Sequence, residues 1–137
     1  MTVVPLAPIV MKNVSLIVDV DDFAKHVSSV TFTVEQSEVT WTGLDGTTYT
    51  ELGPEKWKAT VAYAQDWDTA NSLSEYLFTN RGQKKTVKFQ PRAGSGEAMF
   101  TATCTLASGQ IGGAVAEFAN ASATFGCDGA PVKTTAV

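Results

Sequence analysis

The residues of this chain that could do acid–base or metal chemistry are few. His26 is the single histidine among 137 residues, so a histidine metal cluster or a Ser–His–Asp relay has no second imidazole to draw on. The acidic group Asp19, Asp21 and Asp22 lacks the alternating oxygen ligands and the closing glutamate of a calcium loop. Its composition is typical of a solvated turn. We therefore expect no metal, no cofactor and no catalytic residue here.

A second acidic pair, Asp66 and Asp68, could serve as a general acid and a general base. Both precede an amphipathic segment, and the free N–H groups at a helix start favour negative charge, so we expect Asp68 to cap that helix. The glycines at positions 94, 96, 109, 112 and 113 are not followed by the Lys-Ser/Thr of a phosphate-binding loop, and we expect them in turns. The sequence predicts that the protein is not an enzyme.

The two cysteines, Cys104 and Cys127, fall on apolar strand positions. If residues 97–106 and 117–127 pair antiparallel around a turn at 109–113, Cys104 faces a residue near 118. Cys127 then lies roughly 30 Å away at ~3.3 Å per residue, too far for a disulfide. This register predicts two buried free thiols in a protein made in a reducing compartment.

Composition favours one mainly β domain. The chain holds 18 threonines and 15 valines, whose branching at Cβ suits strands. The net charge of -4 lacks the Lys/Arg surplus of a nucleic-acid-binding protein. We expect neither membrane insertion nor an export signal, because no apolar run approaches ~20 residues and Pro5 and Pro8 interrupt the N-terminal segment.

Hydrophobic periodicity places the elements around one helix. Residues 13–20 and 27–35 alternate and are expected to form a first hairpin. The Asp45-Gly46 dipeptide suits a tight turn, so residues 38–52 are expected to form a projecting hairpin. Further strands are expected at 56–65, 84–90, 98–106 and 115–127. After Asp66 the period lengthens, which predicts a helix at about residues 69–80 closed by Gly82.

This order of elements, with the phrases YAQDW, a helix ending in NRGQ and QIGGAVAEFA, resembles the major tail protein of long-tailed bacteriophages, the tail tube protein. The similarity covers roughly residues 13–127. It implies a β-sandwich or partly rolled barrel with one flanking α-helix, preceded by an extended arm (1–12) and followed by a flexible tail (128–137). Subunits of that family close into rings, with six copies expected, and the rings stack into a tube.

The resemblance also implies partners and a location. The tube would be a structural virion component that conducts the genome into the host, made and assembled in the host cytoplasm. It would meet a tape-measure protein, a tail terminator and baseplate or tail-tip proteins. Double-stranded DNA would pass transiently without specific binding along an acidic wall that repels its phosphates. Glu97 and Glu117 are candidates for that wall.

Two further groups of residues are expected to make contacts, one between rings and one between the helix and the sheet. The expected ring-stacking contacts lie in the hairpin and the arm: Thr42, Leu44, Asp45, Gly46, Thr47, Tyr49, Pro5 and Pro8. The expected helix-docking residues are Trp67, Leu73, Tyr76 and Leu77. A carbohydrate-binding or adhesion sandwich is the alternative function, because Trp41, Tyr49, Trp57 and Trp67 could stack on sugar rings.

Overall fold

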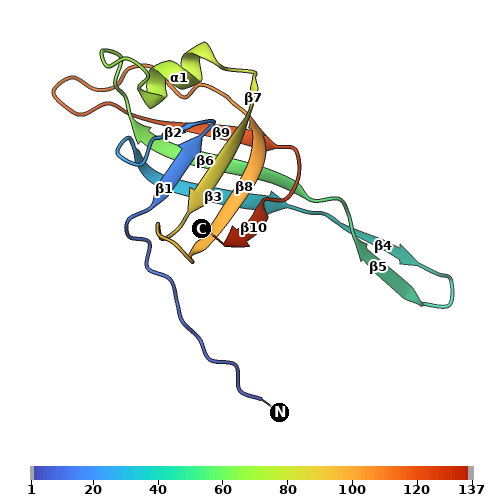
Figure 1. The fold of residues 1–137 in the computed structure, drawn as a ribbon. Helices are drawn as coiled ribbons and strands as arrows, with labels where there is room; N and C mark the ends of the chain where they lie inside the picture. The colour runs from blue at the N-terminus through green and yellow to red at the C-terminus, as the bar shows by residue number, and fades with distance from the viewer. Residues whose placement is uncertain (1, 136–137) are drawn as a thin grey trace.

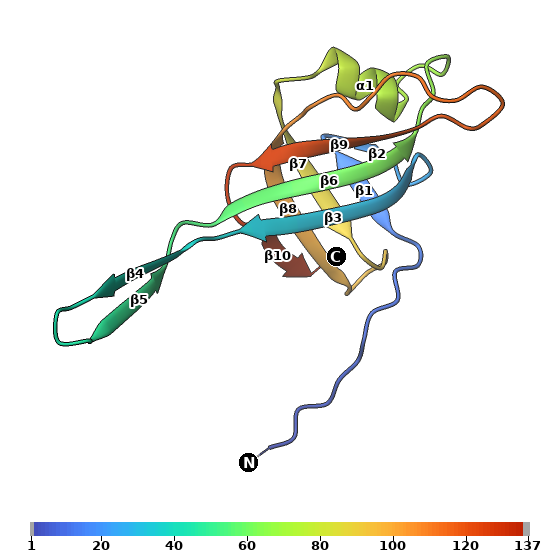
Figure 2. The same cartoon turned by 180° about the vertical axis from the view of Figure 1, so that it is seen from behind.

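The computed structural model describes residues 2–135 and forms a partly rolled sandwich of two antiparallel layers with one short helix (Figures 1 and 2). One layer contains β1 (Ser15–Val18), β2 (Asp21–Asp22), β7 (Lys84–Gln90), β8 (Ala98–Thr105) and β10 (Val132–Thr135). The other contains β3 (Val27–Glu35), β6 (Lys56–Ala64) and β9 (Asn120–Cys127). The strand order β2-β1-β7-β8-β9-β6-β3 runs continuously through both layers, with β10 added on β8. The predicted mainly β sandwich with a flanking helix is confirmed.

The two layers meet at a single corner. β8 and β9 share only two register pairs, Cys104 with Cys127 and Thr105 with Gly126. Beyond that corner β9 pairs with β6 over seven positions, and β8 pairs with β7 over six. Within residues 2–135, β3 has β6 as its only strand partner, so the roll stays open between the two edge strands, β3 and β2.

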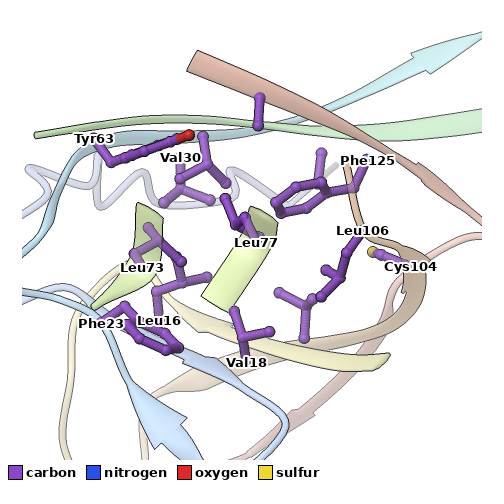
Figure 3. Packing of buried hydrophobic residues seen from close by; sticks show 14 of the residues in the cluster. Leu16, Val18, Phe23, Val30, Tyr63, Leu73, Leu77, Cys104, Leu106 and Phe125 are labelled. Carbon is purple, nitrogen blue, oxygen red and sulfur yellow. The ribbon is translucent and has the colours of Figure 1, made fainter. Parts of the chain in front are cut away.

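The core fills the space between the layers. Along β6 the inward series Ala59, Val61 and Tyr63 is buried, as alternation predicts for a strand with one face on the core. Figure 3 shows Leu73 and Leu77 from the helix among side chains of both layers. Leu77 is fully buried. The helix therefore closes one end of the sandwich with its apolar face.

The helix α1 spans Leu73–Thr79, shorter than expected, and Ser72 is its N-cap. The backbone N–H of Glu75 donates to Ser72 Oγ at 3.4 Å. The prediction of Asp68 as the cap is wrong because residues before Ser72 form a separate turn, closed by Asp66. Gly82 does adopt a positive φ of 83°, although its N–H donates to the carbonyl of Leu106 rather than to the helix.

Three further predictions of strand organisation are wrong. β1 and β3 do not form a hairpin, since β1 pairs with β7 and β3 with β6. β8 and β9 do not pair around a turn at 109–113, because the long connection carries the chain from one layer to the other. The predicted flexible tail is ordered over residues 132–135, since β10 pairs there with Ala98–Thr101 of β8. Positions 1, 136 and 137 of the predicted arm and tail lie outside the described residues.

Candidate assembly surfaces

The most prominent surface feature is the hairpin of β4 (Glu38–Thr42) and β5 (Thr48–Leu52), which projects away from the sandwich (Figures 1 and 2). Its bounds match the sequence prediction. It continues the β3–β6 ladder, whose last pair is Glu35 with Lys56. At ~3.3 Å per residue, the nine steps from Gln36 to Asp45 reach roughly 30 Å. All ten strand residues are exposed.

The tip of the hairpin is a closed turn. The N–H of Gly43 donates to the carbonyl of Thr47 at 2.8 Å, and Gly46 has a φ of 87° that a side chain would strain. The backbone N–H of Thr47 donates to Asp45 Oδ1 at 2.9 Å, and this bond lowers the pKa of the Asp45 carboxyl. Asp45 therefore holds the turn as an anion, and Leu44 beside it is fully exposed.

The base of the hairpin is also tied. The N–H of Gly53 donates to the carbonyl of Ser37 at 2.6 Å, and Gln36 Nε2 donates to the carbonyl of Gly53 at 2.9 Å. A Cβ on Gly53 would lie 2.9 Å from Ser37 Oγ and 3.0 Å from Ser37 O, so the approach requires glycine. These bonds keep the hairpin aligned with the β3–β6 ladder.

The two faces of the hairpin differ. Trp41 and Tyr49 are direct cross-strand partners, with ring centroids 6.0 Å apart, and each is 63% exposed. Val39 lies on the same face, opposite Glu51. The opposite face carries threonines together with Glu38 and Leu52. Tyr49 is among the predicted ring-stacking residues and Val39 is not, although the alternation of Val39 with Trp41 indicates a shared face.

Residues 2–12 of the N-terminal arm form no helix or strand, and their apolar side chains are exposed. Pro8 lies against the β7–β8 connection, where it lines a shallow hollow with Pro91, Arg92 and Glu97. Pro5 lies in the exposed part of the arm. The structure therefore brings Pro8 beside Glu97, although the two were assigned different roles.

Glu117 is placed apart from Glu97. It belongs to the β8–β9 connection, between the exposed side chains of Val115 and Phe118. Glu97 precedes β8, whereas Glu117 follows it, so the whole length of β8 separates the two carboxylates along the chain. This placement does not indicate that Glu97 and Glu117 of one subunit form a single acidic wall.

The helix-docking residues divide into two groups. Leu73 and Leu77 are buried in the core, and Tyr76 packs on Phe23 with ring centroids 5.6 Å apart. Trp67 stays outside, edge-on to Phe78 at 6.0 Å. It forms part of the surface of the helical end.

The aromatic residues proposed for sugar stacking do not share one face. Trp41 and Tyr49 lie on the hairpin, and their rings are tilted by 38° rather than coplanar. Trp57 lines an apolar cavity of about 290 Å³ between the layers, together with Phe32, Phe89 and Phe100. Trp67 flanks the helix. The structure therefore offers no continuous aromatic platform among these four.

Three further observations concern membrane-spanning helices, metal-binding groups and similarity to known proteins. Among the described residues no helix has the length and apolar character needed to cross a membrane. Residues 2–135 also contain no group of three or more His, Cys, Asp or Glu side chains arranged to hold a metal ion. A scan against models of protein families and a search of curated proteins found no match to this chain.

Proposed function

We propose that this chain is a non-enzymatic structural subunit that assembles with copies of itself into stacked rings, as the tail tube of a long-tailed bacteriophage. The observation that carries the proposal is the β4–β5 hairpin. It holds its shape through a closed turn and a tied base, yet it leaves Val39, Trp41, Leu44, Tyr49 and Leu52 exposed. An ordered segment of this kind, rich in exposed apolar groups, is typical of an interaction surface.

The open edge of the sandwich supports ring formation. β3 is nine residues long and, in the part of the chain that the structure describes, pairs on one side only, with β6. The unpaired backbone groups on its other side can be completed by the edge strand of another copy, and a head-to-tail contact that closes makes a ring. The hairpin and the arm reach beyond the sandwich, which suits contacts between rings. Six copies per ring follows from the family resemblance.

The charge of the chain is compatible with a conduit for DNA. The net charge of -4 per copy repels the phosphates of a duplex, so DNA would pass without binding specifically. The tape-measure, terminator and baseplate or tail-tip partners belong to the same proposal, as does the location in the virion tail after assembly in the host cytoplasm.

The experiment is a hairpin deletion that preserves the sandwich. Glu35 and Lys56 are direct cross-strand partners, so an Asn-Gly turn can replace residues 36–55 without changing the β3–β6 register. We expect the wild-type chain to form hollow tubes or rings in negative-stain images of concentrated protein. The truncated chain should remain folded, with a similar thermal midpoint, and form at most single rings rather than stacked tubes, because the β3 edge is retained.

Two results would contradict the proposal. Tubes formed as readily by the truncated chain would show that the hairpin is not an assembly contact. A wild-type chain that stays monomeric at every concentration, and binds glycans, would favour the carbohydrate-binding alternative instead.

A further inference from the structure

The corner where the two layers meet holds both cysteines of the chain. Cys104 is the second-to-last residue of β8 and the direct cross-strand partner of Cys127, the final residue of β9. Their Sγ atoms are 3.2 Å apart, and both thiols are free. Figure 3 shows Cys104 beside Leu106 and Phe125 at the edge of the core. The prediction that the cysteines lie too far apart to bond is wrong, because it assumed the wrong strand pairing.

The backbone at this corner suits a disulfide. The N–H of Asp128 donates to the carbonyl of Thr103 at 3.0 Å, so Thr103 and Asp128, next to the cysteine pair, form a hydrogen-bonded pair. Cys104 and Cys127 therefore form a non-hydrogen-bonded pair, whose Cα atoms lie ~4.5 Å apart with side chains closest. Disulfides accept Cα separations of roughly 4.4–6.8 Å, so the bond requires no movement of the strands.

We propose that Cys104 and Cys127 form a dithiol–disulfide site that a low-molecular-weight disulfide, such as oxidised glutathione, converts to an intrachain cross-link. The thiolate of Cys127 attacks one sulfur of the reagent, forming a mixed disulfide and releasing one glutathione thiolate. The thiolate of Cys104 then attacks the Cys127 sulfur, and the second glutathione leaves. The two protein thiols lose two protons and two electrons, and one glutathione disulfide becomes two thiols.

The order of these steps follows from access. Cys127 is partly exposed, whereas Cys104 is 0% exposed, so the reagent reaches Cys127 first. Burial raises the pKa of the Cys104 thiol, and the nearby Cys127 and Asp128 raise it further, so its direct reaction with reagent is slow. Its proximity to Cys127 makes it the resolving thiol.

The cross-link would act at the joint between the two layers of the sheet. β8–β9 is the only ladder that connects the two layers in the described strand order, and it has two register pairs. A bond between residues 104 and 127 closes a loop of about 24 residues and restricts the unfolded chain accordingly. For a domain of this size we expect the thermal midpoint to rise by about 10 °C on oxidation. This site does not depend on the proposed assembly.

The test uses purified full-length protein, reduced and then treated with oxidised glutathione. We expect the wild-type intact mass to fall by two hydrogens, with no retained glutathione, and the thermal midpoint to rise as above. Cys104→Ser should retain one glutathione on Cys127, because nothing resolves the mixed disulfide. Cys127→Ser should remain largely unmodified in the folded state.

Two kinds of result would contradict the proposed disulfide site. Wild-type protein that retains glutathione, stays a free dithiol or cross-links only between chains would overturn the proposed site. An intrachain bond that leaves the thermal midpoint unchanged would overturn its role in joining the layers. Neither result depends on whether tubes form, so a failure here is separate from a failure of the proposed function.

Discussion

The aromatic face of the hairpin allows the proposed assembly to be tested quantitatively through Trp41→Thr and Tyr49→Thr. Each ring is 63% exposed. A fully buried Trp or Tyr covers about 150–250 Å², so roughly 100–150 Å² of each ring is available to a neighbouring copy. At ~25 cal/mol/Å² this area is equivalent to about 2.5–4 kcal/mol per ring. Threonine keeps a small part of the contact, which leaves a loss of about 2–3 kcal/mol per substitution.

The critical concentration for polymerisation, measured by sedimentation of a dilution series, reports this loss directly. Because ~1.4 kcal/mol is a factor of ten, each single variant should raise the critical concentration about 30- to 150-fold. The double variant should raise it by roughly 1,000-fold or more if the two losses add. The folded monomer should change by less than ~1 kcal/mol, since the substitutions remove one exposed cross-strand pair.

The matched control is the pair on the other face of the same hairpin. Thr40 and Thr50 are direct partners, and Thr40→Ser with Thr50→Ser removes two methyl groups from that face. We expect a change in critical concentration of less than about tenfold. Equal effects of the aromatic and threonine variants, or no effect of either, would refute the inference that the aromatic face is buried between copies.

Two further predictions concern the fold. Gly109→Ala should lower the thermal midpoint by about 4–10 °C, because a Cβ there would lie 2.8 Å from the Ser122 carbonyl and overpacking costs about 1–3 kcal/mol. Gly126→Ala meets nothing within 4 Å and should leave the midpoint within about 3 °C, so equal losses in the two variants would contradict the steric argument. For Asp66, hydrogen bonds from the Thr69 side chain and backbone, then from the N–H of Asp68, hold the carboxyl pKa below its ordinary value. The carboxylate therefore stabilises the fold above its unfolded pKa of about 4, and this stability is lost as pH falls through the lower folded pKa. In urea unfolding, the advantage of wild type over Asp66→Asn should shrink from pH 7 to pH 3, and a constant difference would exclude this role.

Several local features could be predicted from the sequence because they depend on neighbouring residues alone. Alternation identified the strand at 56–65, and the Asp45-Gly46 turn indicated the β4–β5 hairpin, since Gly46 readily adopts the positive φ of 87° found in the turn. The lengthened period after Asp66 located α1. Its first residue was misplaced because several side chains before it can accept a free N–H, and burial of Ser72 decided among them.

The candidate assembly surface was predicted only in part, because only some of its features depend on neighbouring residues alone. The hairpin and the arm are recognisable from local composition. The free edge of β3 cannot be recognised from local composition, because which strand lies at an edge depends on how all the other strands pair. Likewise, the separation of Glu97 from Glu117 followed from where the β8–β9 connection runs.

What the sequence determined by itself was the alternation that marks strands with one apolar face and where the chain turns tightly. The tertiary structure alone decided which strands are neighbours, and with them the pairing of Cys104 with Cys127. The physical reason is that a period of two specifies a buried face but no partner. Because a long connection joins β8 to β9, the local sequence does not set their register, and β9 pairs with β6 over seven positions but with β8 over two.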